Sequence, residues 1–118
     1  MARIYVAGND LDRARKVMDD LINAGHIITY DWVAKFDEGP TKTKAETELG
    51  SVLSADLLVF LWAPNQESAR YEAGMAMGLG KYVVVSGKND SFFFQLDNIH
   101  CVGSDSEIIS KINKLVQY

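Results

Sequence analysis

The stretch Asp56-Leu57-Leu58-Val59-Phe60-Leu61-Trp62 is apolar at every position after its first residue. A strand that is apolar on both faces has to be covered on both sides, which is typical of a central strand in a parallel sheet with helices on either face. Elsewhere along the chain, runs with the period of a strand alternate with runs of helical period, as in consecutive βαβ units. The sequence therefore predicts an α/β fold built around residues 56–62.

Five strands and about four helices are expected. The other strands are predicted at residues 3–7, 26–30, 81–86 and 99–102, and the helices at about 11–22, 42–54, 67–79 and 104–116. The buried helix positions are expected to be Leu11, Ala14, Val17, Met18, Leu21 and Ile22, then Ala45, Leu49, Val52 and Leu53, and finally Ile108, Ile109, Ile112, Leu115 and Val116. Because crossovers between parallel strands are right-handed, the best topology is a three-layer, doubly wound, flavodoxin-like sheet of order 2-1-3-4-5. The 118 residues fit a single domain, residues 1–118.

Composition excludes several classes of protein. The net charge is −4 and no five like charges follow one another, so a nucleic acid polymer is not expected as a partner. The longest apolar run, 57–64, is far shorter than the ~20 residues of a membrane-spanning helix, and residues 1–9 lack a signal-peptide pattern. We therefore expect a soluble, cytoplasmic protein that does not contact membranes. With one cysteine, and two histidines that lack metal-ligand spacing, neither a metal nor another cofactor is expected.

Loops that follow the strands are the predicted binding region. In an open parallel sheet, ligands bind beyond the carboxyl ends of the strands, where the strand order reverses. The two tryptophans at adjacent strand ends could stack on an aromatic base or simply pack at the rim of a helix. The residues selected in this way are Gly8, Asn9, Asp10, Asp31, Trp32, Trp62, Pro64, Asn65 and Gln66.

Two glutamates are candidates for chemistry. Glu72 lies in a helical segment of small residues that otherwise suits close packing, and a carboxylate facing the strand-end crevice could attack an electrophilic carbon. It could instead face solvent and pair with Arg70 or Lys81. Glu48, eight residues before Asp56, would by itself be read as a solvated helix charge.

The segment Glu72-Ala73-Gly74-Met75-Ala76-Met77-Gly78-Leu79-Gly80-Lys81-Tyr82-Val83 resembles the signature of the nucleoside 2-deoxyribosyltransferases. Ile4-Tyr5-Val6-Ala7-Gly8 resembles that family's opening strand, and Ala55-Asp56-Leu57-Leu58-Val59 its third strand. The resemblance implies that Glu72 is a nucleophile that attacks the anomeric carbon of a 2-deoxyribosyl group and expels the base. A second base or water would then accept the sugar.

The same resemblance implies roles for further residues. Tyr5 matches a tyrosine that hydrogen-bonds the nucleophile, and Glu48 matches an aspartate that positions substrate or manages protons. Relatives in the superfamily hydrolyse deoxynucleoside 5'-monophosphates, and the match assigns Gly8, Asn9 and Ser68 to the phosphate.

Two positions depart from the family pattern. Gln66 replaces an aspartate that contacts the base, so it can hydrogen-bond a base but cannot transfer a proton as an acid. Arg70 replaces a small residue and could reach a substrate phosphate or be solvated.

Other readings are a TIR-like NAD glycohydrolase, which the spacing of Ser68 and Glu72 fits loosely, and a non-catalytic nucleotide-binding module, which Glu48 and Gln66 would suit. The expected partner is a small deoxynucleoside or deoxynucleotide. The cluster Phe92-Phe93-Phe94, together with family members that share sites between subunits, predicts a homo-oligomer.

Overall fold

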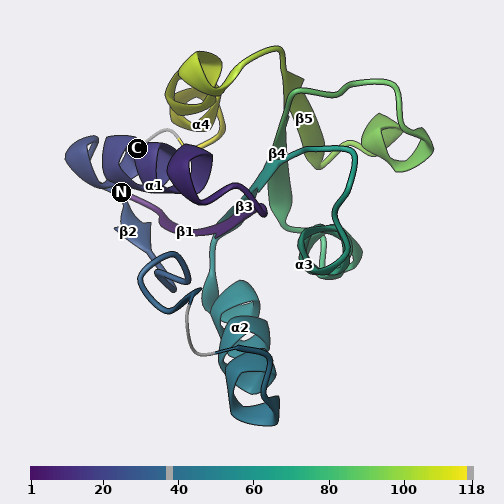
Figure 1. Ribbon diagram of the computed structural model, residues 1–118. Coiled ribbons are helices and arrows are strands. Elements are labelled where there is room, and N and C mark those ends of the chain that lie inside the picture. The colour runs from purple at the N-terminus through teal and green to yellow at the C-terminus, as the bar shows by residue number, and fades with distance from the viewer. Residues whose placement is uncertain (37–38, 117–118) are drawn as a thin grey trace.

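A five-stranded parallel sheet forms the centre of the computed structural model, which describes residues 1–36 and 39–116. The strands lie in the order β2-β1-β3-β4-β5 (Figure 1), so the predicted fold class and strand order are confirmed. In the register of the sheet, Ile4 of β1 lies beside Leu57 of β3, and Leu57 lies beside Tyr82 of β4. The strand bounds are β1 (Arg3–Ala7), β2 (Ile27–Ile28), β3 (Leu57–Leu61), β4 (Tyr82–Ser86) and β5 (Ile99–Val102).

Helices cover both faces of the sheet. α1 (Leu11–Asn23) and α4 (Ile108–Leu115) pack on one face, and α2 (Lys42–Ser54) and α3 (Ser68–Gly78) lie on the other (Figure 1). Short 3-10 turns, η2 (Phe92–Gln95) and η3 (Asp105–Glu107), flank β5. The predicted final helix thus begins as η3, with Ile108 and Ile112 buried. No helix within the described ranges has the length and apolar run required to cross a bilayer.

β3 is buried along its whole length because both of its faces meet helices. Leu57, Val59 and Leu61 pack in the layer of α1 and α4, whereas Leu58 and Phe60 pack in the layer of α2 and α3. Side chains alternate in the same way on β1, where Ile4 and Val6 face the first layer and Tyr5 and Ala7 the second. The tyrosine is therefore directed toward α2 and α3.

The second strand is shorter than the predicted span 26–30. Only Ile27 and Ile28 are assigned to β2, although the Thr29 backbone N–H still donates to the Ile4 carbonyl at 2.9 Å. Asp31 then ends the extended segment, because its carboxylate accepts the backbone N–H of Ala34 at 3.1 Å and turns the chain.

Some helix positions predicted to be buried are exposed. On α1, Ile22 is 50% exposed because it shares a helix side with the ion pair of Arg15 and Asp19. On α2, Leu49 and Leu53 are 43% and 50% exposed, and Ala45 is exposed as well. The prediction was wrong here because α2 projects away from the sheet (Figure 1), so that only Ser51 and Val52 are buried.

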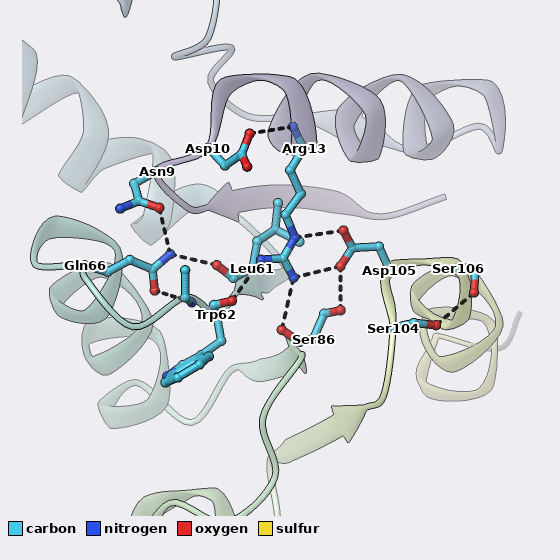
Figure 2. A network of polar contacts seen from close by, with 11 residues as sticks. Asn9, Asp10, Arg13, Leu61, Trp62, Gln66, Ser86, Ser104, Asp105 and Ser106 are labelled. Carbon is cyan, nitrogen blue, oxygen red and sulfur yellow. Dashed lines mark hydrogen bonds and ion pairs between the residues drawn. The ribbon is translucent and has the colours of Figure 1, made fainter.

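A polar network ties the carboxyl ends of β3 and β4 to α1 (Figure 2). The Arg13 guanidinium binds Asp105 through two nitrogens, at 2.8 and 2.9 Å, and donates to the carbonyls of Trp62 at 2.8 Å and Ser86 at 3.2 Å. The Ser86 hydroxyl donates to Asp105 at 2.6 Å. Hydrogen bonds from Arg13 hold the pKa of the Asp105 carboxyl below its usual range, so the network stays charged at neutral pH.

Replacing a central strand residue tests the packing. Leu58→Ala removes a fully buried side chain, and we expect it to lower the free energy of unfolding by about 2–5 kcal/mol in urea denaturation. Leu53→Ala, at an exposed leucine of α2, is the control and should change it by less than about 0.5 kcal/mol. Equal losses in the two variants would contradict the central position of β3.

Candidate active site

Tyr5 and two glutamates meet between α2 and α3. Tyr5 is fully buried on β1, and its hydroxyl donates a hydrogen bond to Oε2 of Glu72 on α3. The same hydroxyl lies 3.3 Å from Oε1 of Glu48 on α2. The structure therefore brings Tyr5 together with two glutamates that follow it by 43 and 67 positions along the chain.

Small residues on α3 make this approach possible. Ala69, Ala73 and Ala76 are buried against the sheet and form one stripe of the helix. Without bulky side chains in that stripe, α3 lies close to the sheet, and Glu72 at the border of the stripe reaches the Tyr5 hydroxyl. Glu72 is partly buried and does not form the ion pair with Arg70 or Lys81 that was the solvent-exposed alternative.

The surroundings of Glu72 favour its protonated form. Burial raises the pKa of the Glu72 carboxyl from 4.5 to about 8, the Tyr5 hydrogen bond acts in the opposite direction, and repulsion by Glu48 adds to the rise. Burial and the two carboxylates also raise the pKa of the Tyr5 hydroxyl, which stays protonated and acts as a donor. At neutral pH the Glu72 carboxyl consequently keeps its proton.

Two adjoining cavities lie beside the carboxyl pair, and Glu48 lines both of them, whereas Glu72 lines the smaller one. One of about 200 Å³ is lined by Glu72, Glu48 and Ser68, together with Leu49, Tyr71 and Met75. A second of about 500 Å³ shares Ala45, Glu48 and Ser68 with the first. The larger volume is in the usual range of small-molecule sites, ~300–1,000 Å³, and the smaller is below it. The second cavity is completed by Phe36, Gly39, Pro40, Thr41 and Lys44.

Polar side chains predicted to bind substrate brace the loop after β3 (Figure 2). The Gln66 amide nitrogen donates to the Leu61 carbonyl at 2.7 Å, and its oxygen accepts the Ala63 N–H at 2.9 Å. The Asn9 amide donates to the Asn65 carbonyl at 2.9 Å and also approaches Gln66. Here Gln66 satisfies backbone groups of the loop that precedes α3.

Gly8 permits close packing between β1 and β3. A Cβ atom at this position would lie 3.3 Å from Cβ of Leu61, which is tighter than an ordinary contact. The residue keeps the loop after β1 close to the loop that Gln66 braces.

The loop after β2 is held by structural contacts. Asp31 forms an ion pair with Arg15 at 2.8 Å; burial opposes its ionisation, but Arg15 and the Ala34 N–H together lower its pKa. The Trp32 indole donates to the Val6 carbonyl at 2.6 Å and packs against both core clusters. Trp32 thus has the rim packing that was the alternative to base stacking.

Trp62 and Arg70 lie on the other side of α3. Arg70 donates to the carbonyls of Ala63 at 2.8 Å and Pro64 at 2.9 Å, and its guanidinium is 5.6 Å from the centre of the Trp62 ring. Both residues line a separate cavity together with Ala73 and Gly74. The predicted site residues are therefore divided among the carboxyl pair, the loop braces and this second side of α3.

Sequence reasoning missed part of the lining. Lys44 and Thr41 lie four and seven positions before Glu48, which places them on its side of the helix, so helical spacing could have identified them. Phe36 lies before the helix, and no local pattern indicated it. Among residues 1–36 and 39–116, no group of three His, Cys, Asp or Glu side chains could hold a metal ion.

By structure, the chain is a doubly wound α/β domain with a tyrosine-bridged carboxyl pair between two helices of one layer. Its fold is similar to that of a CMP N-glycosidase from Clostridium botulinum, BcmB. The TM-score is 0.68 with 16% sequence identity, over 97% of this chain and 99% of the other, and the likeness establishes the shared fold. No protein-family model and no curated protein matches the sequence.

The raised pKa of Glu72 predicts how stability changes with pH. Since the folded protein keeps a proton that the unfolded chain loses near pH 4.5, the free energy of unfolding should fall as pH rises from about 4.5 to 8. Glu72→Gln, which keeps an acceptor for Tyr5, should remove much of that fall in urea denaturation across this range.

Glu46→Gln is the matched control, because Glu46 is an exposed glutamate of α2. It should keep the pH dependence of the original protein. The same slope in the Glu72→Gln protein would show that Glu72 titrates normally.

Proposed function

We propose that this protein cleaves the N-glycosidic bond of nucleosides or nucleotides, with Glu72 as the nucleophile. The observation that carries the proposal is the Tyr5 hydroxyl bound to Glu72 and close to Glu48, beside two adjoining cavities that these glutamates help to line. A fold shared with a CMP N-glycosidase supports the same class of reaction.

The reaction needs one ionised and one protonated carboxyl. The Glu72 carboxylate attacks the anomeric carbon, the carbon–nitrogen bond breaks, and the base leaves with the bonding electrons and takes up a proton supplied by Glu48. Water, or a second base, then attacks the glycosyl ester, gives up a proton to Glu48 and releases Glu72. Because burial favours the protonated form of Glu72, its proton has to pass to Glu48 before the attack.

Tyr5 assists by donating to Glu72. Its hydrogen bond opposes the rise in the pKa of Glu72 that burial causes, and so favours the carboxylate form that attacks the sugar. As the base departs, positive charge develops on the sugar, and a carboxylate in a poorly solvated site stabilises that charge more strongly than it would in water.

The proposed substrates are 2'-deoxynucleosides or their 5'-monophosphates, with transfer of the deoxyribosyl group to water or to another base. Lys44 supplies a cation to the larger cavity, and Ser68 is shared by both cavities, so a phosphorylated substrate would meet complementary groups. In this proposal Gln66, whose amide is bonded to backbone groups of the loop after β3, supports the start of α3.

Free base detected by chromatography tests the substrate class. The protein is incubated separately with 2'-deoxynucleosides, their 5'-monophosphates, CMP and NAD. We expect base release from the 2'-deoxy compounds. Base release from CMP alone would show that the sugar is ribose and not the proposed deoxyribose. Release of nicotinamide from NAD alone would favour the TIR-like alternative. Binding without release of any base would favour the non-catalytic module.

Removing the nucleophile tests the role of Glu72. Glu72→Gln should lower kcat/KM at least about 1,000-fold, because an amide cannot form the glycosyl ester. Glu46→Gln should retain turnover, and far-ultraviolet circular dichroism should show both proteins folded. Substantial turnover by the Glu72→Gln protein would refute the assignment.

The carboxyl pair also predicts a pH profile. Above about pH 8 the pair loses the proton that the departing base needs, so kcat/KM should fall as pH rises through that value. Tyr5→Phe removes a hydrogen bond that lowers the pKa of Glu72, so it should reduce kcat/KM about 100-fold and move this descending limb to higher pH. Tyr82→Phe, at an exposed tyrosine of β4, is the control. An unmoved limb in Tyr5→Phe would contradict the role given to Tyr5.

The homo-oligomer is proposed on the exposed apolar residues of α2 and α3. Leu49, Tyr71 and Met75 are 40–61% exposed and line the cavity of Glu72, so a second copy packed there would cover apolar surface and shield the site. Light scattering at micromolar concentration should give the mass of an oligomer, and Leu49→Ser combined with Met75→Ser should give a monomer.

A further inference from the structure

A third cavity lies on the side of α3 that faces away from Glu72. Its volume is about 350 Å³, within the range of small-molecule sites. Phe60, Ala73 and Met77 form part of its lining, with Trp62 and residues 92–94 around them. The lining is therefore mostly aromatic and apolar.

Two cations approach the same aromatic ring at this cavity. The Lys88 ammonium lies 4.8 Å and the Arg70 guanidinium 5.6 Å from the centre of the Trp62 ring. Asp90 forms an ion pair with Lys88 at 2.7 Å, whereas in the described part of the chain the Arg70 side chain contacts backbone carbonyls and no carboxylate. In a chain of net charge −4, the cavity thus carries a local excess of positive charge.

The phenylalanines at the cavity are unusually exposed. Phe92 is 83% and Phe93 63% exposed, with their rings in edge contact at 5.2 Å, while Phe94 packs against the core. Large exposed aromatic residues beside a cavity are more common at binding surfaces than elsewhere on a soluble protein. The 3-10 turn η2 fixes these rings next to Trp62.

We propose that this cavity binds a small planar aromatic anion. The ring of the ligand packs against Trp62 and the phenylalanines of η2, and its anionic group lies between Arg70 and Lys88. An anion there supplies a negatively charged partner for Arg70, beside the Lys88 that Asp90 already pairs, and the aromatic body removes apolar surface from water. This site is separated from the carboxyl pair by α3 and does not depend on the proposed function.

Calorimetric titration with three probes tests both halves of the proposal. Naphthalene-2-carboxylate should bind. Naphthalene-2-methanol, which lacks the charge, and cyclohexanecarboxylate, which lacks the aromatic ring, should each bind at least about threefold more weakly. Equal affinity for the carboxylate and the alcohol, or no binding of the carboxylate, would overturn the proposal.

Variants locate the bound probe. Arg70→Gln and Lys88→Gln should each weaken naphthalene-2-carboxylate about threefold to fivefold and leave the alcohol unchanged. Trp62→Leu, which keeps an apolar side chain but no ring, should weaken both naphthalenes. Lys114→Gln, at an exposed lysine of α4, makes the same change in net charge and should have no effect. Affinity that is the same in all four variants would place the probe elsewhere and refute this site.

Discussion

The covering of β3 on both faces is the constraint on which the rest of the structure depends. Because all five residues of this strand are buried, a helix layer has to pack on each side of it. The layer of α2 and α3 lies on the face that also receives Tyr5 of β1, and the alanine stripe of α3 lets that helix come close to the sheet. The meeting of Tyr5 with Glu48 and Glu72 follows from this packing and needs no special local backbone.

Placing two carboxyls in an apolar layer opposes stability. A buried carboxylate is costly unless it is hydrogen-bonded or protonated, and here both remedies are present, since Tyr5 donates to Glu72 and the pair retains a proton. For stability alone, two apolar side chains would be a simpler arrangement than two buried carboxyl groups. Carboxyl groups with a strongly raised pKa are frequent at functional sites, which fits the role proposed for Glu72.

Much of the fold could be predicted from the sequence, because β3 and the alternating periods restrict an α/β chain to few topologies. The burial of α2 could not, since the pattern around Leu49 and Leu53 does not reveal that the helix projects from the sheet. At the site, the resemblance to the nucleoside 2-deoxyribosyltransferases implied that Tyr5, Glu48 and Glu72 act together, whereas Glu48 by itself would be read as a solvated charge. The roles of Gln66 and Arg70 were beyond sequence reasoning because either side chain can turn toward a ligand or toward nearby carbonyls, and only tertiary packing selects between these.

The side chains that hydrogen-bond to the loop after β3 make one side of the site more rigid than the other. On the α3 side, Gln66, Arg70 and Asn9 each bond to backbone groups between residues 61 and 65, so displacement of that side breaks several hydrogen bonds at once. On the α2 side, two of the thirteen helix residues are buried, and the hydrogen bonds from Arg3 and Lys81 reach its last residues and the residue after it. A segment with so few buried contacts opens at lower free energy than its neighbours. The α3 side, where Tyr5 and Glu72 are bonded to each other, is therefore expected to resist displacement more strongly than the α2 side.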